Sequence, residues 1–309
     1  MVDTLSHDPR WPRAGGWPAL SDLAPDAHAD LVLLGVPAWR TSLSPTNAHA
    51  TPAAIRAALR RYSPALMPHR AQRAAPADLE RMRVVDAGDV DEPDGPDGER
   101  RTAADVASAR ERASMVLALG GDNSVTVPAA LGAWGAELAT AGLVTLDAHL
   151  DLRDGVSNGA PVRRLVEAGL DPSRVVQIGI ADFANSADYA RRAAELGITI
   201  VHRDELHRRS PDEVMREALA IAGAAGGPVH LDIDADVCDR SIAPACPASV
   251  PGGIAAWELR ALAREAARDP RVRSADLVEI DATADAPDGR TVRLAALCVL
   301  ELLAGIAMR

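Results

Sequence analysis

The sequence contains no lysine, because all 33 of its basic side chains are arginine. This excludes a Schiff-base lysine and the lysine of a nucleotide-binding P-loop as the chemistry of the protein. Cysteine is also sparse. The three cysteines, Cys238, Cys246 and Cys298, are odd in number and form no Cys-x-x-Cys pattern, which argues against a disulfide framework or a zinc ribbon. They favour a reducing, cytoplasmic environment.

Long apolar runs and basic patches are lacking as well. No stretch approaches the about 20 apolar residues that a membrane helix needs. The polar, acidic start has neither the basic flank nor the apolar run of a secretory signal. Acidic side chains outnumber basic ones by 44 to 33, and the formal net charge of -11 disfavours a nucleic-acid partner. We therefore expect a soluble, cytoplasmic protein that acts on a small molecule and binds neither nucleic acid nor membrane.

The chain does have a globular composition, with 48% hydrophobic and 25% charged residues over a length of 309. Short runs rich in β-branched residues alternate with alanine-rich amphipathic segments, which is typical of repeated βα units and a parallel sheet. No internal repeat is evident. We predict an α/β fold in a single domain over residues 1–309, in which residues 1–28 form an N-terminal extension.

Eight strands and eight helices are expected. The strands are predicted at residues 30–36, 83–89, 115–119, 143–147, 175–180, 198–202, 229–234 and 274–280. The helices are predicted at residues 52–62, 103–114, 125–136, 161–167, 187–195, 211–222, 256–267 and 290–307. The acidic, turn-rich segment 91–99 is expected to be a surface loop after the second strand. Functional groups should gather at the carboxyl ends of the strands.

Two predicted strands run into clusters of potential metal ligands at alternating positions. These residues are Asp147, His149 and Asp151 at the first strand, and Asp232, Asp234 and Asp236 at the second. Carboxylates packed this closely would repel one another and have raised pKa values unless a cation compensated them. Oxygen-rich ligation with one or two imidazoles suits manganese or magnesium better than zinc. We therefore predict a metal site that lowers the pKa of a water for hydrolysis.

The motifs resemble those of the arginase, agmatinase and formimidoylglutamase superfamily. DAHLD at 147–151 and DADVCD at 234–239 resemble its two metal-binding motifs. GGDNS at 120–124 resembles its Gly-Gly-Asp-His-Ser loop, and DLVE at 276–279 resembles its late strand that ends in a substrate-facing glutamate. The resemblance extends from about residue 30 to the C-terminus. It implies a three-layer α/β/α sandwich of about eight mainly parallel strands, and a homo-oligomer.

The same resemblance implies a cofactor of Mn²⁺, with two ions per subunit. Asp147, Asp151 and Asp234 would be shared or first-metal ligands, and His149 and Asp236 would complete the second metal. Asp151 would also hydrogen-bond the bridging hydroxide and is, in that sense, a predicted catalytic residue.

Two positions depart from the family's metal ligands, and a third, Glu279, is expected to contact the substrate. The family's first histidine ligand is Asn123 here, and its neutral amide is a weaker donor than imidazole, so the site is expected to hold two ions or only one. Asp232 lies one alternation before the family's first ligand on its strand, so we expect it at most to support the ligands. Glu279 would hold a cationic amidine or guanidine and is the other predicted catalytic residue.

The loop after the first motif indicates a subgroup. Arginases and agmatinases carry a histidine there, whereas this chain has Asn158 at the matching position, which weakens the case for urea-forming hydrolysis. DLR at 151–153, APACPA at 243–248 and PGG at 251–253 resemble formimidoylglutamases. The predicted reaction is hydrolysis of N-formimidoyl-L-glutamate to L-glutamate and formamide in histidine breakdown.

A substrate with two carboxylates needs a cationic partner, and Arg153 beside the cluster is the first candidate. The alternative for Arg153 is an ion pair with Asp154 or another acid of the cluster. Ser157 and Asn158 are further predicted substrate contacts, and Arg40 and Arg163 are weaker candidates. Two other functions stay open. One is an agmatinase or guanidinobutyrase type of hydrolase that releases urea, and the other is a non-catalytic metal or ligand sensor that keeps the fold.

Overall fold

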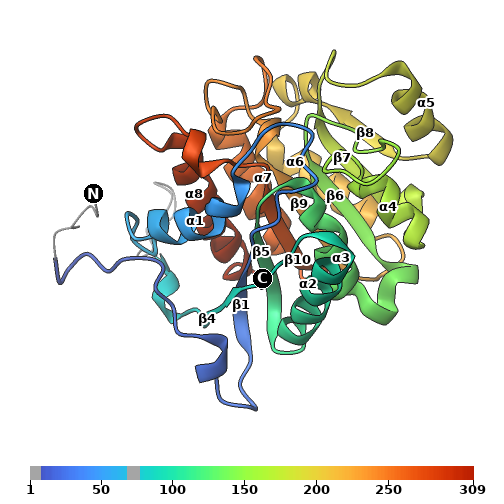
Figure 1. The fold of residues 1–309 in the computed structure, drawn as a ribbon. Coiled ribbons are helices and arrows are strands. Elements are labelled where there is room, and N and C mark those ends of the chain that lie inside the picture. Colours follow the sequence, from blue (N-terminus) through green and yellow to red (C-terminus); the bar gives the residue numbers. More distant parts are fainter. Residues whose placement is uncertain (1–7, 68–76) are drawn as a thin grey trace.

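A computed structural model describes residues 8–67 and 77–309 (Figure 1). At its centre is an eight-stranded sheet in the order β4-β1-β5-β10-β9-β6-β7-β8, in which all neighbouring strands are parallel. The strands are β1 (Ala29–Val36), β4 (Val84–Asp89), β5 (Ala113–Gly120), β6 (Gly142–Leu146), β7 (Val175–Ile180), β8 (Thr199–His202), β9 (Val229–Asp234) and β10 (Val272–Val278). All eight predicted strands are confirmed, with small shifts at their ends.

Helices cover both faces of this sheet (Figure 1). Helices α1, α6, α7 and α8 pack on one face, and α2, α3, α4 and α5 pack on the other. Their bounds are α1 (Thr51–Leu59), α2 (Gly95–Arg110), α3 (Thr126–Trp134), α4 (Pro161–Ala168), α5 (Ala187–Leu196), α6 (Pro211–Ala222), α7 (Ala256–Arg268) and α8 (Arg290–Ile306). The expected three-layer α/β/α sandwich is confirmed.

Strands β1 and β5 are largely apolar because they are buried on both faces. Side chains alternate along a strand, so Leu31 and Leu33 of β1 pack in the core beside α1 and α8, whereas Val32 and Leu34 pack in the core beside α2. A strand buried on both sides needs no solvent-facing polar side, which gives the nearly continuous apolar runs of β1 and β5.

One prediction about the start of helix α2 was wrong. The segment 91–99 was expected to be a surface loop, but α2 begins inside it, at Gly95. Asp94 has an extended backbone just before the helix, and Pro96 lies in the first turn, where its missing N–H costs nothing. The Asp94 carboxylate accepts hydrogen bonds from two backbone amides of the loop after β1. Residues typical of a turn therefore begin a helix here.

Two smaller features lie outside the sandwich. A short antiparallel pair, β2 (Ala65–Leu66) and β3 (Ala77–Asp78), was not predicted. The chain before β1 contacts the edge strand β4, where the Asp86 backbone N–H donates to Pro18 O over 2.9 Å. Among the helices of the described ranges, none is both long and apolar enough to cross a membrane.

Candidate active site

Four neighbouring strands carry the predicted site residues at their carboxyl ends. Strand β5 leads into Asn123, β6 into Asp147 and β10 into Glu279, while β9 ends in Asp234. These strands are parallel and adjacent in the order β5-β10-β9-β6, so their carboxyl ends meet at one edge of the sheet. The sheet topology thus brings residues from distant parts of the chain together.

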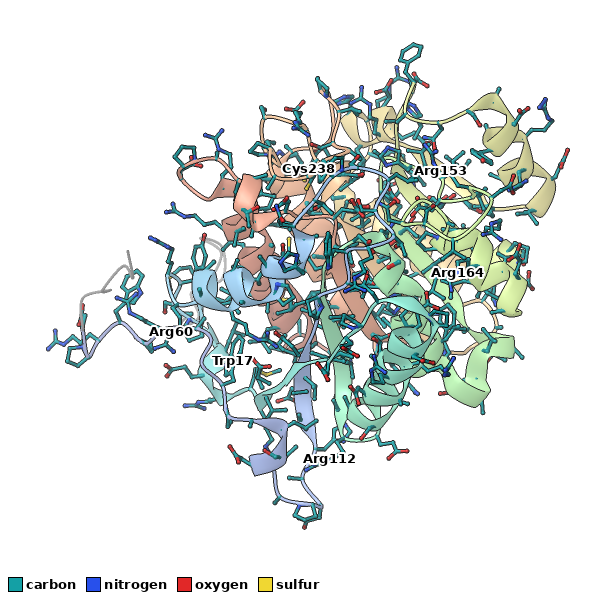
Figure 2. All side chains as sticks on the ribbon, in the orientation of Figure 1. Trp17, Arg60, Arg112, Arg153, Arg164 and Cys238 are labelled. Atoms are coloured by element: carbon teal, nitrogen blue, oxygen red, sulfur yellow. The ribbon has the colours of Figure 1, made fainter. Side chains whose placement is uncertain are left out.

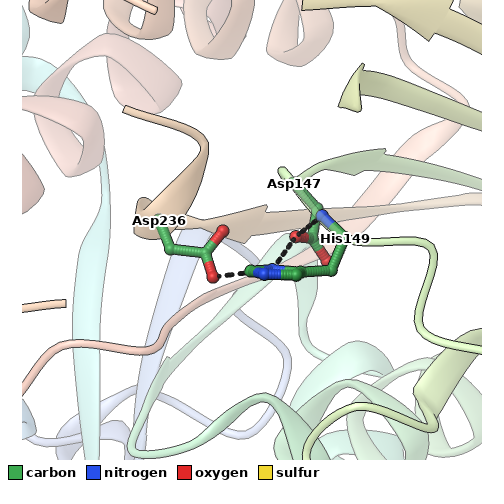
Figure 3. Close-up of side chains that lie close together, drawn as sticks. All are labelled: Asp147, His149 and Asp236. Atoms are coloured by element: carbon green, nitrogen blue, oxygen red, sulfur yellow. Dashed lines mark hydrogen bonds and ion pairs between the residues drawn. The ribbon is translucent and has the colours of Figure 1, made fainter. Parts of the chain in front are cut away.

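Asp147, His149 and Asp236 form a first trio of possible metal ligands (Figure 3). The His149 Nδ1 atom lies 3.3 Å from Asp147 Oδ1 and 3.0 Å from Asp236 Oδ2. Burial lowers the pKa of His149, but the charges of Asp236 and Asp147 outweigh it and raise the pKa to about 12. One ligand atom of each residue lies within 4.8 Å of the others, so the trio can surround a single cation.

Asp147, Asp151 and Asp232 form a second trio, with ligand atoms that also lie within 4.8 Å of one another. Burial, and then neighbouring acids, raise the pKa of Asp151 and Asp232 well above the usual range. Asp147 Oδ2 and both oxygens of Asp232 are buried without a hydrogen-bond partner among the described residues. Unpaired buried carboxylates are costly, so these donors fit a bound cation. Asp147 belongs to both trios, as a carboxylate shared by two metals would.

Asp234 lies beside the two trios. Burial raises its pKa well above the usual range, and the charges of Asp236 and Asp147 raise it further. Its Oδ1 atom accepts the Asp236 backbone N–H over 2.7 Å, which holds the turn after β9. Asp234 therefore adds one more negative charge to the same small volume.

The side chain of Asn123 lies against the second trio. Its Nδ2 donates to Asp151 Oδ2 over 2.6 Å, and its Oδ1 accepts from Thr126 Oγ1 over 2.7 Å. The amide nitrogen thus faces the carboxylate, while the oxygen contacts the threonine. In this arrangement Asn123 orients Asp151, and its role as a metal ligand stays a prediction.

Glu279 follows β10 in the left-handed backbone region, with φ of 62°, which is uncommon for a residue other than glycine. Its Oε1 accepts two hydrogen bonds, from the Asn123 backbone N–H over 2.7 Å and from Asn158 Nδ2 over 2.8 Å. Burial is the main cause that raises the pKa of Glu279 to about 8. The carboxylate is therefore fixed in place and would gain from a cationic partner.

A cavity of about 270 Å³ opens above these groups. Its lining includes His149, Asp151, Asp234, Asp236, Arg153, Asn158 and Glu279. The exposed Arg153 has no ion pair with any residue that the structure describes, and Asp154 pairs with Arg192 instead, over 2.9 Å. Figure 2 shows Arg153 near the end of the molecule that holds the cavity. Arg112, which precedes β5, lies near the other end. Acidic side chains at the bottom of the cavity and the cationic Arg153 at its rim thus face the same space.

The other predicted substrate contacts differ in position. Ser157 is buried and is not among the described residues that line the cavity. The Arg163 guanidinium donates to Glu167 Oε1 over 2.6 Å and to the backbone carbonyl oxygen of Arg153. These two contacts already occupy the side chain. Arg40 is exposed, and its Nε atom lies 4.0 Å from Asp94 Oδ2.

Several residues of the cavity lining were missed in the sequence, and Asn185 is one that contacts the metal-binding motif. Asn185, in the loop after β7, accepts the Leu150 backbone N–H over 2.8 Å and donates to Ala148 O over 2.9 Å. It thereby holds the DAHLD segment from outside. A lone asparagine in a loop carries no sequence signal beyond its position after a strand.

A family model described as "Arginase family" matches residues 29–305. This chain belongs to the arginase family. Among related sequences, the formimidoylglutamase of Halalkalibacterium halodurans is 31% identical over 282 residues, which cover 88% of this arginase-family chain and 86% of the relative. The guanidinopropionase of Pseudomonas aeruginosa is 34% identical over 248 residues, which cover 77% and 76%.

Solved structures agree on the fold of this arginase-family protein. The crystal structure of Trypanosoma cruzi formiminoglutamase with Mn²⁺ superposes with a TM-score of 0.83 and covers 94% of this chain and 99% of its own. Its sequence identity is 22%, so the likeness concerns the fold. The resemblance inferred from the sequence motifs is confirmed, and the arginase-family chain is a hydrolase related to formimidoylglutamases.

Proposed function

We propose that this protein is a manganese-dependent hydrolase of a linear amidine, N-formimidoyl-L-glutamate. One water is consumed, the carbon–nitrogen bond between the formimidoyl carbon and the glutamate nitrogen breaks, and L-glutamate and formamide are released. The observation that carries the proposal is the pair of acidic trios sharing Asp147 beneath a cavity whose wall holds Glu279. Similarity to the H. halodurans formimidoylglutamase over 88% of the chain supports the choice of substrate.

The metal would be held by the buried groups at the ends of β5, β6 and β9. We assign this role to Asn123, Asp147, His149, Asp151, Asp234 and Asp236. A donor set of carboxylates with one imidazole suits manganese, and the related T. cruzi structure contains Mn²⁺. Two trios with one shared carboxylate favour two ions per subunit. When bound, manganese supplies the Lewis acid that lowers the pKa of a water at neutral pH.

The protein's own residues would bind the amidine and move protons. Glu279 pairs with the amidinium, because its Oε1 is held by Asn123 and Asn158 while the cavity lies in front of the carboxylate. A bound cation favours the charged form of this carboxylate and so opposes the effect of burial. Asp151, which Asn123 orients, accepts a hydrogen bond from the attacking water and holds its proton.

The opposite end of the substrate would contact the rim of the cavity. Arg153 is exposed at the rim and is not engaged by Asp154, so its guanidinium can pair with a substrate carboxylate. Asn158 completes the proposed substrate contacts, whereas Ser157 is buried in the same loop and does not line the cavity. This distribution of charge favours a substrate with a cationic amidine at one end and carboxylates at the other.

A guanidino acid has the same distribution of charge, so a urea-forming hydrolase is the second candidate. The 34% identity to the P. aeruginosa guanidinopropionase favours it. Agmatine fits less well, because it has no carboxylate for Arg153.

The test is product release from manganese-loaded protein. N-Formimidoyl-L-glutamate, 3-guanidinopropionate, agmatine and arginine are supplied in turn, each with a chelator-treated control. Chelator-sensitive formamide from the first substrate alone supports the proposal. Urea from a guanidine moves the protein to the second candidate. No product from any of the four contradicts both and favours a sensor that keeps the fold.

We also propose the cellular setting. The chain would act as one domain over residues 1–309, with residues 1–28 as an extension, in the cytoplasm and in histidine breakdown. The three cysteines are buried and free, which suits a reducing compartment. A homo-oligomer is expected by family resemblance, and light scattering coupled to size-exclusion chromatography tests it.

A further inference from the structure

A row of buried polar side chains crosses the sheet directly beneath the proposed metal ligands. The strand register places Asp232 of β9 beside Asp276 of β10 on one side and beside Thr145 of β6 on the other. All three are completely buried. Side chains alternate along a strand, so Asp232 points to the same face as Asp234, one step deeper in the sheet.

Asp276 has a histidine partner in this row, whereas Asp232 has only the carboxyl group of Asp276 beside it. His230 Nε2 lies 3.0 Å from Asp276 Oδ2, and its Nδ1 lies 2.7 Å from Ser274 Oγ, as expected for a core histidine. Both oxygens of Asp232 are buried without a hydrogen bond to any residue of the described ranges. A carboxyl group in this state is stable as a carboxylate only beside a positive charge, and without one burial favours its neutral form.

The position of that charge follows from the second trio. One Asp232 oxygen lies within 4.8 Å of carboxylate oxygens of both Asp147 and Asp151. Oxygens that coordinate one ion at about 2.1 to 2.4 Å lie at most about twice that distance apart. A single ion can therefore contact all three carboxylates.

We propose that Asp232 is a direct ligand of the manganese ion that lies between Asp147 and Asp151. The amide of Asn123 contacts Asp151, so positions 123 and 232 flank the same ion. The Asp232 carboxylate supplies the charged oxygen that the neutral amide of Asn123 does not. This inference rests on the metal dependence in the proposed function and is independent of the substrate.

The first measurement is calorimetric titration with Mn²⁺ of the wild type, Asp232→Asn and the matched control Asp276→Asn. Asp276 lies in the same row, is equally buried and undergoes the same isosteric change. We expect Asp232→Asn to weaken one of the binding events by at least about 10-fold, as for loss of a group that supports a metal. Wild-type affinity in Asp232→Asn overturns the inference, as does an equal loss in Asp276→Asn.

A second readout separates a ligand from a structural residue. The visible absorption of Co²⁺-loaded protein responds to the number and geometry of the ligands, so it should change in Asp232→Asn and not in Asp276→Asn. Without metal, Asp232→Asn should unfold at a temperature no lower than the wild type, because the change removes a buried acid whose charged form burial and the neighbouring acids disfavour. A lower unfolding temperature without metal, together with an unchanged spectrum, would assign Asp232 a structural role only.

The double variant Asn123→His, Asp232→Asn tests whether both positions serve one ion. Imidazole is a stronger donor than an amide, so the double variant should regain much of the lost affinity. Failure to regain it contradicts the shared ion. If Mn²⁺ binds as described but no amidine is hydrolysed, only the proposed function fails. If the wild type turns over substrate while Asp232→Asn binds Mn²⁺ normally, only this inference fails.

Discussion

Asn158 donates from Nδ2 to Glu279 Oε1 over 2.8 Å and accepts the Leu43 backbone N–H at Oδ1 over 3.0 Å. One side chain thereby joins three segments, the loop after β1, the loop after β6 and the end of β10. These segments meet only because the sheet order places their strands at one edge. The orientation of the proposed amidine-binding carboxylate therefore depends on a loop far away in the sequence.

Replacing Asn158 with alanine should raise the KM for the amidine. Loss of a hydrogen bond to a charged group costs about 1.5 to 3 kcal/mol, which corresponds to roughly 10- to 150-fold in kcat/KM. Steady-state kinetics on the variant measures this change. Asn47→Ala is the matched control, because the Asn47 side chain contacts Thr283 and not Glu279. An unchanged KM in Asn158→Ala would refute the role of this contact.

Glu279→Gln should lower kcat/KM by about 100-fold or more, because it removes the charge that pairs with the amidinium. Manganese binding should stay close to that of the wild type, since Glu279 belongs to neither trio. Parallel kinetics and Mn²⁺ titration separate the two effects. A variant that loses its manganese would instead place Glu279 in the metal site.

Arg153→Ala should affect only substrates that carry carboxylates. The KM for N-formimidoyl-L-glutamate should rise by about 10-fold, in the range expected for a lost charge-assisted hydrogen bond. Hydrolysis of formamidine, which has no carboxylate, should be unaffected. Arg192→Ala serves as the control, because Arg192 pairs with Asp154 outside the cavity lining. Equal losses on both substrates would mean that Arg153 has a structural role.

Manganese should stabilise the folded protein. Mn²⁺ at about 100 times its Kd contributes about 2.7 kcal/mol if it binds only the folded state. Thermal unfolding with Mn²⁺, and again after chelation, measures the shift in Tm. Asp147→Asn should abolish most of it, because Asp147 belongs to both trios. The absence of any shift in the wild type would contradict a metal site at these carboxylates.

Gly121→Ala should destabilise the protein and the site together. A Cβ atom at Gly121 would lie 1.7 Å from the Ala38 carbonyl oxygen, so the backbone must move. The Gly121 carbonyl also accepts the Glu279 backbone N–H over 2.8 Å. At the control position, Gly155, a Cβ meets nothing within 4 Å and the cost is only the left-handed backbone, about 1 to 2 kcal/mol. Urea unfolding should show the larger loss for Gly121→Ala.

The sequence by itself determined the strands and the composition of the site. Runs such as β1 and β5 are apolar at nearly every position because both faces of the sheet are covered, so they are recognisable without a structure. Asp147, Asp234 and Glu279 follow or end such runs, and parallel strands place these ends at one edge. The chemistry of a metal site could therefore be predicted from residue type and position alone.

Only the tertiary structure decided which side chains are paired. Asp154 contacts Arg192 rather than its neighbour Arg153, and Asp232 lies within reach of Asp147 and Asp151 while His230 contacts Asp276. These pairings depend on the order and register of strands that are not consecutive in the chain, which local periodicity does not encode. The physical reason is that a pair contact is set by the packing of the whole sheet, whereas a strand is set by the burial of its own residues.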